Sequence, residues 1–123
     1  MKYERVKNNT RLVRVVTEIP ADSDVTPLVE LSRADGVTAS NVNYVLVRAW
    51  LDGDLSGTAP ALLTGDHEDR VVATLDPQGL PVTVTTGQVA SVEWTAGIPL
   101  MRLKASENQA AARSVVLLLW QFE

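Results

Sequence analysis

The only histidine of the chain lies in an acidic segment, and this is the first combination of side chains that could do chemistry. His67 is flanked by Asp66, Glu68 and Asp69 in the stretch TGDHEDR, residues 64–70. Carboxylate oxygens and imidazole nitrogen can bind divalent cations, and carboxylates suit calcium. However, adjacent residues of an extended chain point in different directions, and the spacing is not that of an EF-hand. We interpret the stretch as a solvated acidic loop, with Asp66, His67 and Asp69 as its candidate metal ligands, and expect no cofactor.

Catalytic motifs of other kinds find little support. A serine–histidine–aspartate triad would have to use His67, and no G-x-S-x-G turn presents a serine. The chain has no cysteine, which excludes thiol nucleophiles, thiolate zinc sites and disulfides. The stretch GTAPALLTG (57–65) lacks the lysine of a phosphate-binding loop. A glycosidase-type carboxylate pair could meet only in the fold, so a glycan hydrolase is the least favoured reading. We predict that the protein is not an enzyme.

The three tryptophans could bind a ligand but have no catalytic group. Trp50, Trp94 and Trp120 could together form a platform on which sugar rings stack. Each of them lies inside a run of alternating residues, where packing in a core or an interface is the commoner role. The sequence therefore leaves glycan binding as the alternative to a structural role.

Charge and length limit the class of protein. The 123 residues carry 11 Lys+Arg and 15 Asp+Glu, and a net charge of −4 argues against affinity gained by neutralising phosphates. We expect one domain over residues 11–123, preceded by a basic arm over residues 1–10. No apolar run of signal-peptide or membrane-span length is present, so a membrane is not an expected partner. Because of the negative net charge, a nucleic acid is not an expected partner either.

The dominant period along the chain is two, which is typical of strands. β-Branched and aromatic residues fill these runs, and turn residues separate them, as in DPQG (76–79), RADG (33–36), LDGD (51–54) and TTGQ (85–88). Only ENQAAAR (107–113) has helical propensity, enough for a turn or two. The pattern predicts an all-β, antiparallel β-sandwich or jelly roll of about eight strands with at most one short helix. The predicted strands cover residues 11–19, 26–31, 43–52, 60–64, 70–75, 81–86, 89–94, 99–105 and 113–122.

Two of these strands are apolar on both faces. In residues 113–122, one face carries Val115, Leu117 and Leu119, and the other carries Val116, Leu118, Trp120 and Phe122. Strict alternation in residues 43–52 places Tyr44, Leu46, Arg48 and Trp50 on one face, and Val45, Val47, Ala49 and Leu51 on the other.

A sandwich strand usually has one face in the core and one in water, so the second apolar face needs cover. Either a loop or the N-terminal segment folds over it, or a partner subunit does. We favour the partner, because monomers rarely expose a large contiguous apolar patch. Val115, Leu117 and Leu119 are then expected in the core, whereas Leu118, Trp120 and Phe122 are expected to line an intersubunit surface.

The order of the segments resembles that of small β-sandwich virion proteins of tailed bacteriophages. The resemblance rests on four elements, Ile19-Pro20-Ala21, Val47 to Trp50, Asp76 to Val84, and Arg102 to Leu119 with its QAAAR stretch. It covers the chain apart from the basic arm. Where such proteins often carry a D-G-x-x-W/F stretch, this chain has GDHEDRVV. The resemblance brings no catalytic residue.

What the resemblance implies is a structural protein of the phage particle. The expected role is a capsid decoration (cement) protein, or an accessory protein of the neck or tail, and its expected partners are the major capsid protein or other virion proteins. A homo-oligomer, with a trimer favoured, would cover the second apolar face. Lys2, Arg5 and Lys7 of the basic arm could lie against an acidic capsid or neighbour surface. The alternative is a glycan- or receptor-binding module on a phage neck, tail or fibre.

Overall fold

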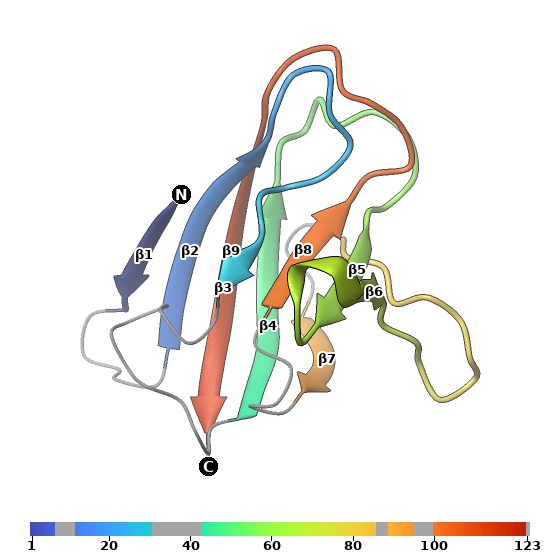
Figure 1. Cartoon of the computed structure of the whole chain (residues 1–123). Coiled ribbons are helices and arrows are strands. Elements are labelled where there is room, and N and C mark those ends of the chain that lie inside the picture. The colour runs from blue at the N-terminus through green and yellow to red at the C-terminus, as the bar shows by residue number, and fades with distance from the viewer. Residues whose placement is uncertain (7–11, 31–42, 86–88, 95–99, 123) are drawn as a thin grey trace.

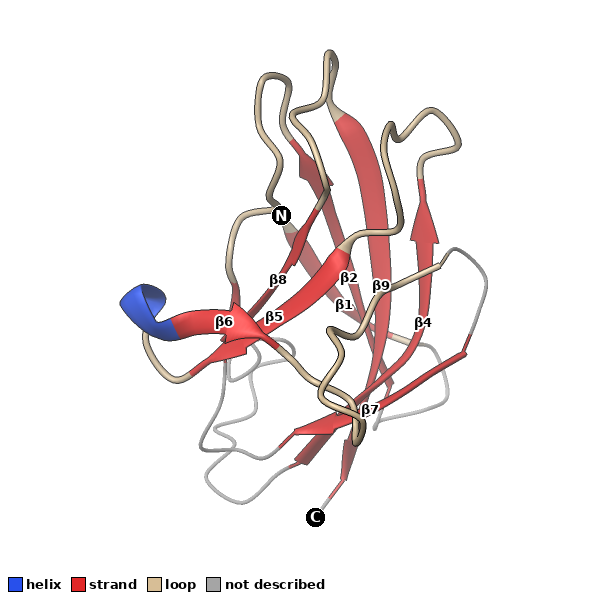
Figure 2. Ribbon diagram, turned by 90° about the vertical axis from the view of Figure 1, so that its right-hand side faces the viewer, coloured by secondary structure: helices blue, strands red, loops and turns tan. Residues whose placement is uncertain are grey.

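The chain folds into two antiparallel β-sheets that face each other, as the computed structural model shows for residues 1–6, 12–30, 43–85, 89–94 and 100–122. Figure 2 shows β5, β6 and β8 of the second sheet to one side of β9 and β4 of the first. The predicted all-β sandwich is therefore confirmed. In the described residues the helical structure is confined to one 3-10 turn, Glu68–Arg70 (η2).

The sheets differ in size and in the order of their strands. The first has the order β1-β2-β9-β4-β7, and the second has the order β3-β8-β5-β6 (Figure 1). The bounds in the first sheet are Lys2–Arg5 (β1), Leu12–Ile19 (β2), Arg113–Phe122 (β9), Asn43–Leu51 (β4) and Val89–Trp94 (β7). Those in the second are Val29–Glu30 (β3), Leu100–Lys104 (β8), Ala61–Gly65 (β5) and Val71–Ala73 (β6).

The core lies between the sheets, and β9 supplies its centre. Val115, Leu117 and Leu119 are at most 1% exposed, as the alternation predicted. Directly opposite residues of paired strands share a face, so Val13 and Val15 of β2 also point inward, opposite Leu119 and Leu117. The second sheet contributes further apolar side chains that are fully buried, namely Leu62, Met101 and Leu103.

Strict alternation in β4 was a wrong prediction, because the strand contains a bulge. Its register with β9 shifts between Leu46 and Arg48, so that Leu46 lies opposite Leu119 and Arg48 lies opposite Leu118. A bulge inserts one extra residue and reverses the faces that follow it. Leu46 and Ala49 are therefore both buried, while Arg48 and Trp50 both point outward.

Residues 107–113, whose helical propensity could supply at most a turn or two, form an irregular loop before β9, in agreement with the prediction of at most one short helix. A run this short gains little from helical propensity. The side chain of Gln109 is 1% exposed, and its Oε1 accepts hydrogen bonds from Ser56 N (3.0 Å) and Arg113 Nε (3.3 Å). Its Nε2 donates to the carbonyl oxygens of Ser56 (3.2 Å) and Glu107 (3.0 Å).

The backbone of Gln109 adds a third loop to this network. Its N–H donates to Ser23 O (2.9 Å), and its carbonyl accepts from Asp22 N (2.8 Å). One buried amide side chain and its peptide groups thus join the loop after β2, the loop after β4 and the loop before β9. Tertiary hydrogen bonding overrides the local preference of the alanine run.

The predicted turn at DPQG is confirmed. Gly79 N donates to Asp76 O (2.9 Å). Gly79 has a φ of 81°, a backbone conformation that residues with a side chain rarely adopt. The predicted strand over residues 81–86 is not formed in its described part. There the chain makes the isolated bridges Leu75↔Pro81 and Ala61↔Thr83. The predicted turns at 33–36 and 85–88 lie wholly or partly outside the described residues.

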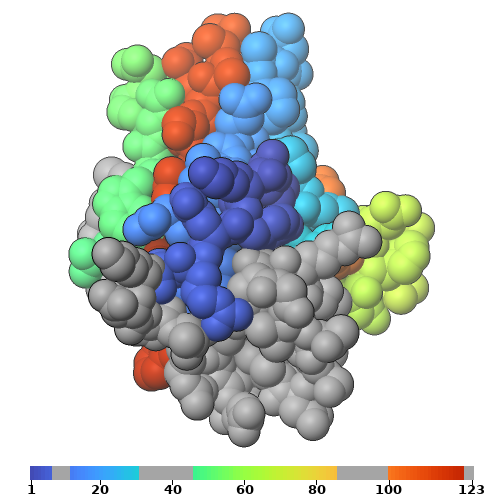
Figure 3. Space-filling model, turned by 90° about the vertical axis from the view of Figure 1, so that its left-hand side faces the viewer, coloured from blue at the N-terminus to red at the C-terminus, as the bar shows by residue number. Residues whose placement is uncertain are grey.

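The basic N-terminal segment begins with an edge strand of the first sheet. β1 pairs antiparallel with β2, from Lys2↔Val16 to Arg5↔Val13. The hydroxyl of Tyr3 accepts a hydrogen bond from the backbone N–H of Glu30 (3.1 Å), which links this edge to the second sheet. Figure 3 shows the deep-blue atoms of this strand beside the cyan atoms of the segment that contains β3.

Replacing Gln109 tests how far the loops depend on its amide. Gln109→Ala leaves Ser56 and Glu107 without their buried partner, and each unsatisfied buried group costs about 1–3 kcal/mol. We expect urea denaturation to give a loss of about 2–4 kcal/mol in the free energy of unfolding. The control is Asn108→Ala, an exposed amide one residue away, which should change it by about 0.5 kcal/mol or less. Equal effects of the two changes would contradict the assignment.

Candidate functional site

The outward side of the first sheet carries an apolar and aromatic surface, which we call the outer sheet face. Trp50 and Trp120 are 41% and 46% exposed, and smaller apolar side chains between them are half-buried. The β-pairing places Trp50 opposite Val116 and Leu12 opposite Trp120. The described side chains of this face are Lys2, Glu4, Leu12, Arg14, Val16, Glu18, Arg48, Trp50, Ser114, Val116, Leu118 and Trp120.

Cationic side chains interrupt the apolar surface at its centre. Leu118 lies opposite Arg14 on one side and Arg48 on the other, in the same row across the strands. Glu4 approaches Arg14 at 3.9 Å and Lys2 at 3.7 Å. Tryptophan and arginine are the residue types most enriched at energetic centres of interfaces. The outer sheet face therefore combines exposed tryptophan and arginine, two residue types that are enriched at interfaces, with several further charged side chains.

The two exposed tryptophans lie at opposite ends of this face. Trp50 is opposite Val116, and Trp120 follows Val116 by four residues along β9. With a rise of about 3.3 Å per residue, the two indoles are anchored about 13 Å apart along the strand. That separation gives room for an extended ligand as well as for a protein surface.

A second exposed apolar group lies on β6 and on the loop that follows it. Val72, Leu75 and Leu80 are 66%, 58% and 61% exposed, and the loop stands away from both sheets in Figure 1. Asp76 orders its tip. Its Oδ1 accepts from the backbone N–H groups of Gln78 (2.9 Å) and Leu80 (2.9 Å), and Asp76 N donates to Leu80 O (2.8 Å). The loop thus presents apolar side chains on a hydrogen-bonded support.

The acidic segment connects β5 to β6 and lies at the opposite end of β6 from this loop, on the β6 edge of the second sheet. Arg70 Nε donates to Asp66 Oδ1 at 2.9 Å, and this hydrogen bond lowers the pKa of the Asp66 carboxyl below its usual value. His67 Nδ1 accepts from Asp69 N (3.2 Å) and caps the 3-10 turn. A side chain at Gly65 would meet the backbone of Arg70, so glycine permits this tight connection.

The three candidate metal ligands do not form a cluster suited to an ion. Within the described ranges, no three histidine, cysteine or carboxylate residues are grouped as metal binding requires. Instead, Asp66 accepts a hydrogen bond from Arg70, and His67 accepts one from the backbone N–H of Asp69. An open hollow of about 260 Å³ adjoins this segment, lined by Leu28, Glu30, Asp66, His67, Glu68 and Leu100.

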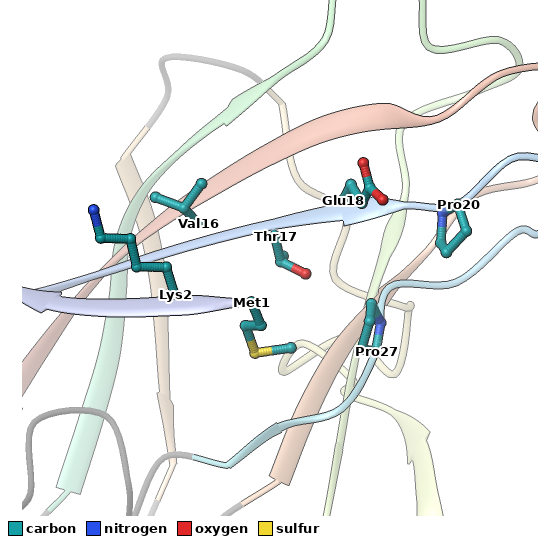
Figure 4. A pocket seen from close by; sticks show the side chains of 7 residues that line it. All are labelled: Met1, Lys2, Val16, Thr17, Glu18, Pro20 and Pro27. Carbon is teal, nitrogen blue, oxygen red and sulfur yellow. The ribbon is translucent and has the colours of Figure 1, made fainter.

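Two other hollows occur on the described surface. One, of about 390 Å³, lies at the β1 edge and is shown in Figure 4, lined by Met1, Lys2, Val16, Thr17, Glu18, Pro20 and Pro27. The other, of about 310 Å³, lies beside the loop after β4 and is lined by residues that include Leu55, Pro60 and Val84. Both are shallow and open. The polar side chains that line them are Lys2, Thr17 and Glu18 in the first, and Asp52, Thr58 and Thr85 in the second.

Only some of the predicted interface residues lie on the outer sheet face. Leu118 and Trp120 lie on the outer sheet face, and the side chain of Lys2, 72% exposed, borders it. Arg5 is exposed on the edge strand. Lys7 and the side chains of Phe122 and Trp94 lie outside what the structure describes. Sequence reasoning did not single out Arg14, Arg48, Leu75 or Leu80. The alternation in residues 11–19 could have indicated Arg14, whereas Arg48 depends on the bulge.

Comparisons with known proteins give no relative. No family model, no curated protein and no solved structure matches this chain. None of the described helical structure is long and apolar enough to cross a membrane.

Truncation of two adjacent residues of β9 should lower the stability by different amounts. Leu119 is 1% exposed, so Leu119→Ala should lower the free energy of unfolding by about 2–5 kcal/mol. Trp120 is 46% exposed, so Trp120→Ala should cost about 1 kcal/mol despite the larger side chain. Chemical denaturation at low protein concentration measures both. A loss for Trp120→Ala as large as for Leu119→Ala would show that the indole belongs to the core.

The ion pair of the acidic segment predicts a titration shift. Arg70→Gln removes the hydrogen bond that lowers the pKa of Asp66, so this pKa should rise toward the value of an ordinary aspartate. A group with a lowered folded pKa favours the folded state above its unfolded pKa and loses that contribution as pH falls through its folded pKa. Carboxyl-carbon NMR of Asp66 between about pH 2 and 6 measures the shift. An unchanged titration curve would contradict the assignment.

Proposed function

We propose that this chain is a structural protein of a tailed-phage particle, most specifically a capsid decoration protein that acts as a homotrimer. The observation that supports the proposal is the outer sheet face, on which two half-exposed tryptophans flank a row of apolar and arginine side chains. A face of this composition on a small domain favours burial in an assembly. The order of sequence segments that resembles small virion proteins gives the particle as the setting.

The physical role follows from what such a face can do. A decoration subunit makes contacts that exist in the complete shell and are lost when the shell comes apart. Each specific contact commonly buries about 1,600 Å² in total, and repetition over the shell multiplies its effect. The sandwich has a buried core, and hydrogen bonds of Gln109 join its loops, so it can support these contacts. The proposed partners are neighbouring copies and the major capsid protein.

The test uses phage heads made with and without the gene for this chain. Heads without it should assemble and then release DNA at lower temperature, and added purified protein should bind them and restore their heat stability. Trp120→Ala protein should fold but restore stability poorly, because its contact face has lost an anchoring indole. A matched control is Asn108→Ala, which changes an exposed side chain on a different loop. Equal stability with and without the protein would overturn the proposal.

A second candidate function is supported by the exposure of the tryptophans. Trp50 and Trp120 present half of each indole beside Arg48 and Arg14, as a glycan-binding platform would. In this reading the protein is a glycan- or receptor-binding module of a phage neck, tail or fibre.

Intrinsic fluorescence distinguishes this second function. If the face binds glycans, oligosaccharides prepared from the host cell surface should change the tryptophan emission in a saturable way. Trp50→Ala and Trp120→Ala, made separately, should each weaken the binding by roughly tenfold, since an aromatic contact contributes about 1 kcal/mol or more. An emission spectrum that no host glycan changes would remove this candidate.

A further inference from the structure

We infer that the outer sheet face of one copy receives the loop after β6 and the acidic segment of the next copy, in a head-to-tail contact. The inference rests on the proposed function, because it specifies how the proposed homotrimer is joined. Two exposed apolar surfaces are available on each copy, and they lie on different elements. The donor surface, which we call the hairpin surface, follows the β6 edge of the second sheet: Asp66, Glu68 and Asp69 lie before β6, Val72 lies in it, and Leu75, Asp76 and Leu80 lie on the loop after it.

The charges of the two surfaces are complementary. Residues 66–76 hold four carboxylates and one arginine, and that arginine is hydrogen-bonded to Asp66. The described part of the outer sheet face holds three cations, Lys2, Arg14 and Arg48, against two carboxylates, Glu4 and Glu18. The side chain of Asp69 is 84% exposed and therefore accessible to a cation of another chain. Opposite charges that meet across an interface select the register and the partner.

The apolar parts of the two surfaces also match in kind. Leu75 and Leu80 project from the loop, and the outer sheet face offers Val116, Val16 and the exposed half of Trp50. Projecting leucines on an ordered turn and a tryptophan-bordered sheet are suited to mutual burial, since little ordering entropy is lost on contact. The hydrogen bonds of Asp76 supply that order before binding.

A contact between two outer sheet faces is disfavoured by the same charges. With a twofold axis along β9 and centred on Leu118, Arg48 of one copy would lie over Arg14 of the other. With the axis across the strands, Arg48 would lie over its own equivalent. Both arrangements bring arginines together in a desolvated surface, which costs free energy. A head-to-tail contact avoids this and leaves each copy able to engage two neighbours, as a closed ring requires.

The two surfaces face different directions on one copy. In Figure 2 the 3-10 turn of the acidic segment projects from the side of the second sheet, away from the strands of the first sheet. The loop after β6 also stands away from both sheets in Figure 1. One copy can therefore donate its hairpin surface and receive another at the same time.

The absence of cysteine from the sequence makes the contact testable by cross-linking. Leu80→Cys and Val116→Cys proteins are prepared separately, mixed, and treated with a short bis-maleimide. The inference predicts a covalent dimer in the mixture, and only traces when either protein is treated alone. Asn108→Cys, an exposed position on another loop, is the matched control and should not cross-link to Val116→Cys. Cross-linking of Val116→Cys to itself, or none in the mixture, would overturn the inference.

Charge reversal gives a second measurement that does not depend on cross-linker geometry. Arg48→Glu should weaken self-association by roughly tenfold or more in sedimentation equilibrium, because it replaces an attraction by a repulsion. A single chain that carries Arg48→Glu together with Glu68→Arg and Asp69→Arg should regain self-association, because every head-to-tail contact then pairs opposite charges again. All these side chains are exposed, so circular dichroism should show unchanged folding. Failure of this chain to regain self-association would contradict the contact.

The two proposals fail in different ways. Protein that stabilises phage heads but gives no cross-link and stays monomeric when free would leave the function standing and overturn the head-to-tail contact. Protein that forms the predicted cross-link but neither binds heads nor alters their heat stability would support the head-to-tail contact and overturn the proposed function. The purified full chain serves for both experiments.

Discussion

The pairing of β9 with a strand on each side is the constraint on which the rest of this structure depends. β9 runs antiparallel to β2 over eight residue pairs and to β4 over a similar length, so the backbone of one segment organises most of the first sheet. Its inner side chains, from Val115 to Leu119, are removed from water by both neighbouring strands and by the second sheet. A shift of one residue in this register would bring Leu118 and Trp120 inward and put the core leucines in water.

The loops at one end of the sandwich are fixed by polar rather than apolar interactions. Gln109 is buried, and its amide and peptide groups satisfy donors and acceptors from two other loops. Such a network holds loop geometry because a buried polar group without a partner is costly. The core therefore determines the layers, and the network before β9 determines how the chain connects them at that end.

The two surfaces on which the proposals rest, the outer sheet face and the hairpin surface, point away from the core. The register that buries Leu117 and Leu119 places Leu118 and Trp120 outside, and the bulge in β4 adds Arg48 and Trp50 to the same side. Core packing and the outer sheet face are thus consequences of one register. The hairpin surface arises differently, because β6 is short and Asp76 folds the following segment into a projecting turn.

The sequence by itself determined the class of fold and the inner face of β9. Period-two alternation with turn residues follows directly from the geometry of a strand, so residues 113–122 could be read without any knowledge of their neighbours. The turn at Asp76–Gly79 was equally local, since it needs only its own residue types. Tertiary structure decided what depends on contacts between distant segments. The bulge that turns Arg48 and Trp50 outward exists only in the register of β4 with its neighbours β9 and β7. The alanine run before β9 is an irregular loop because buried hydrogen bonds outweigh a weak helical propensity.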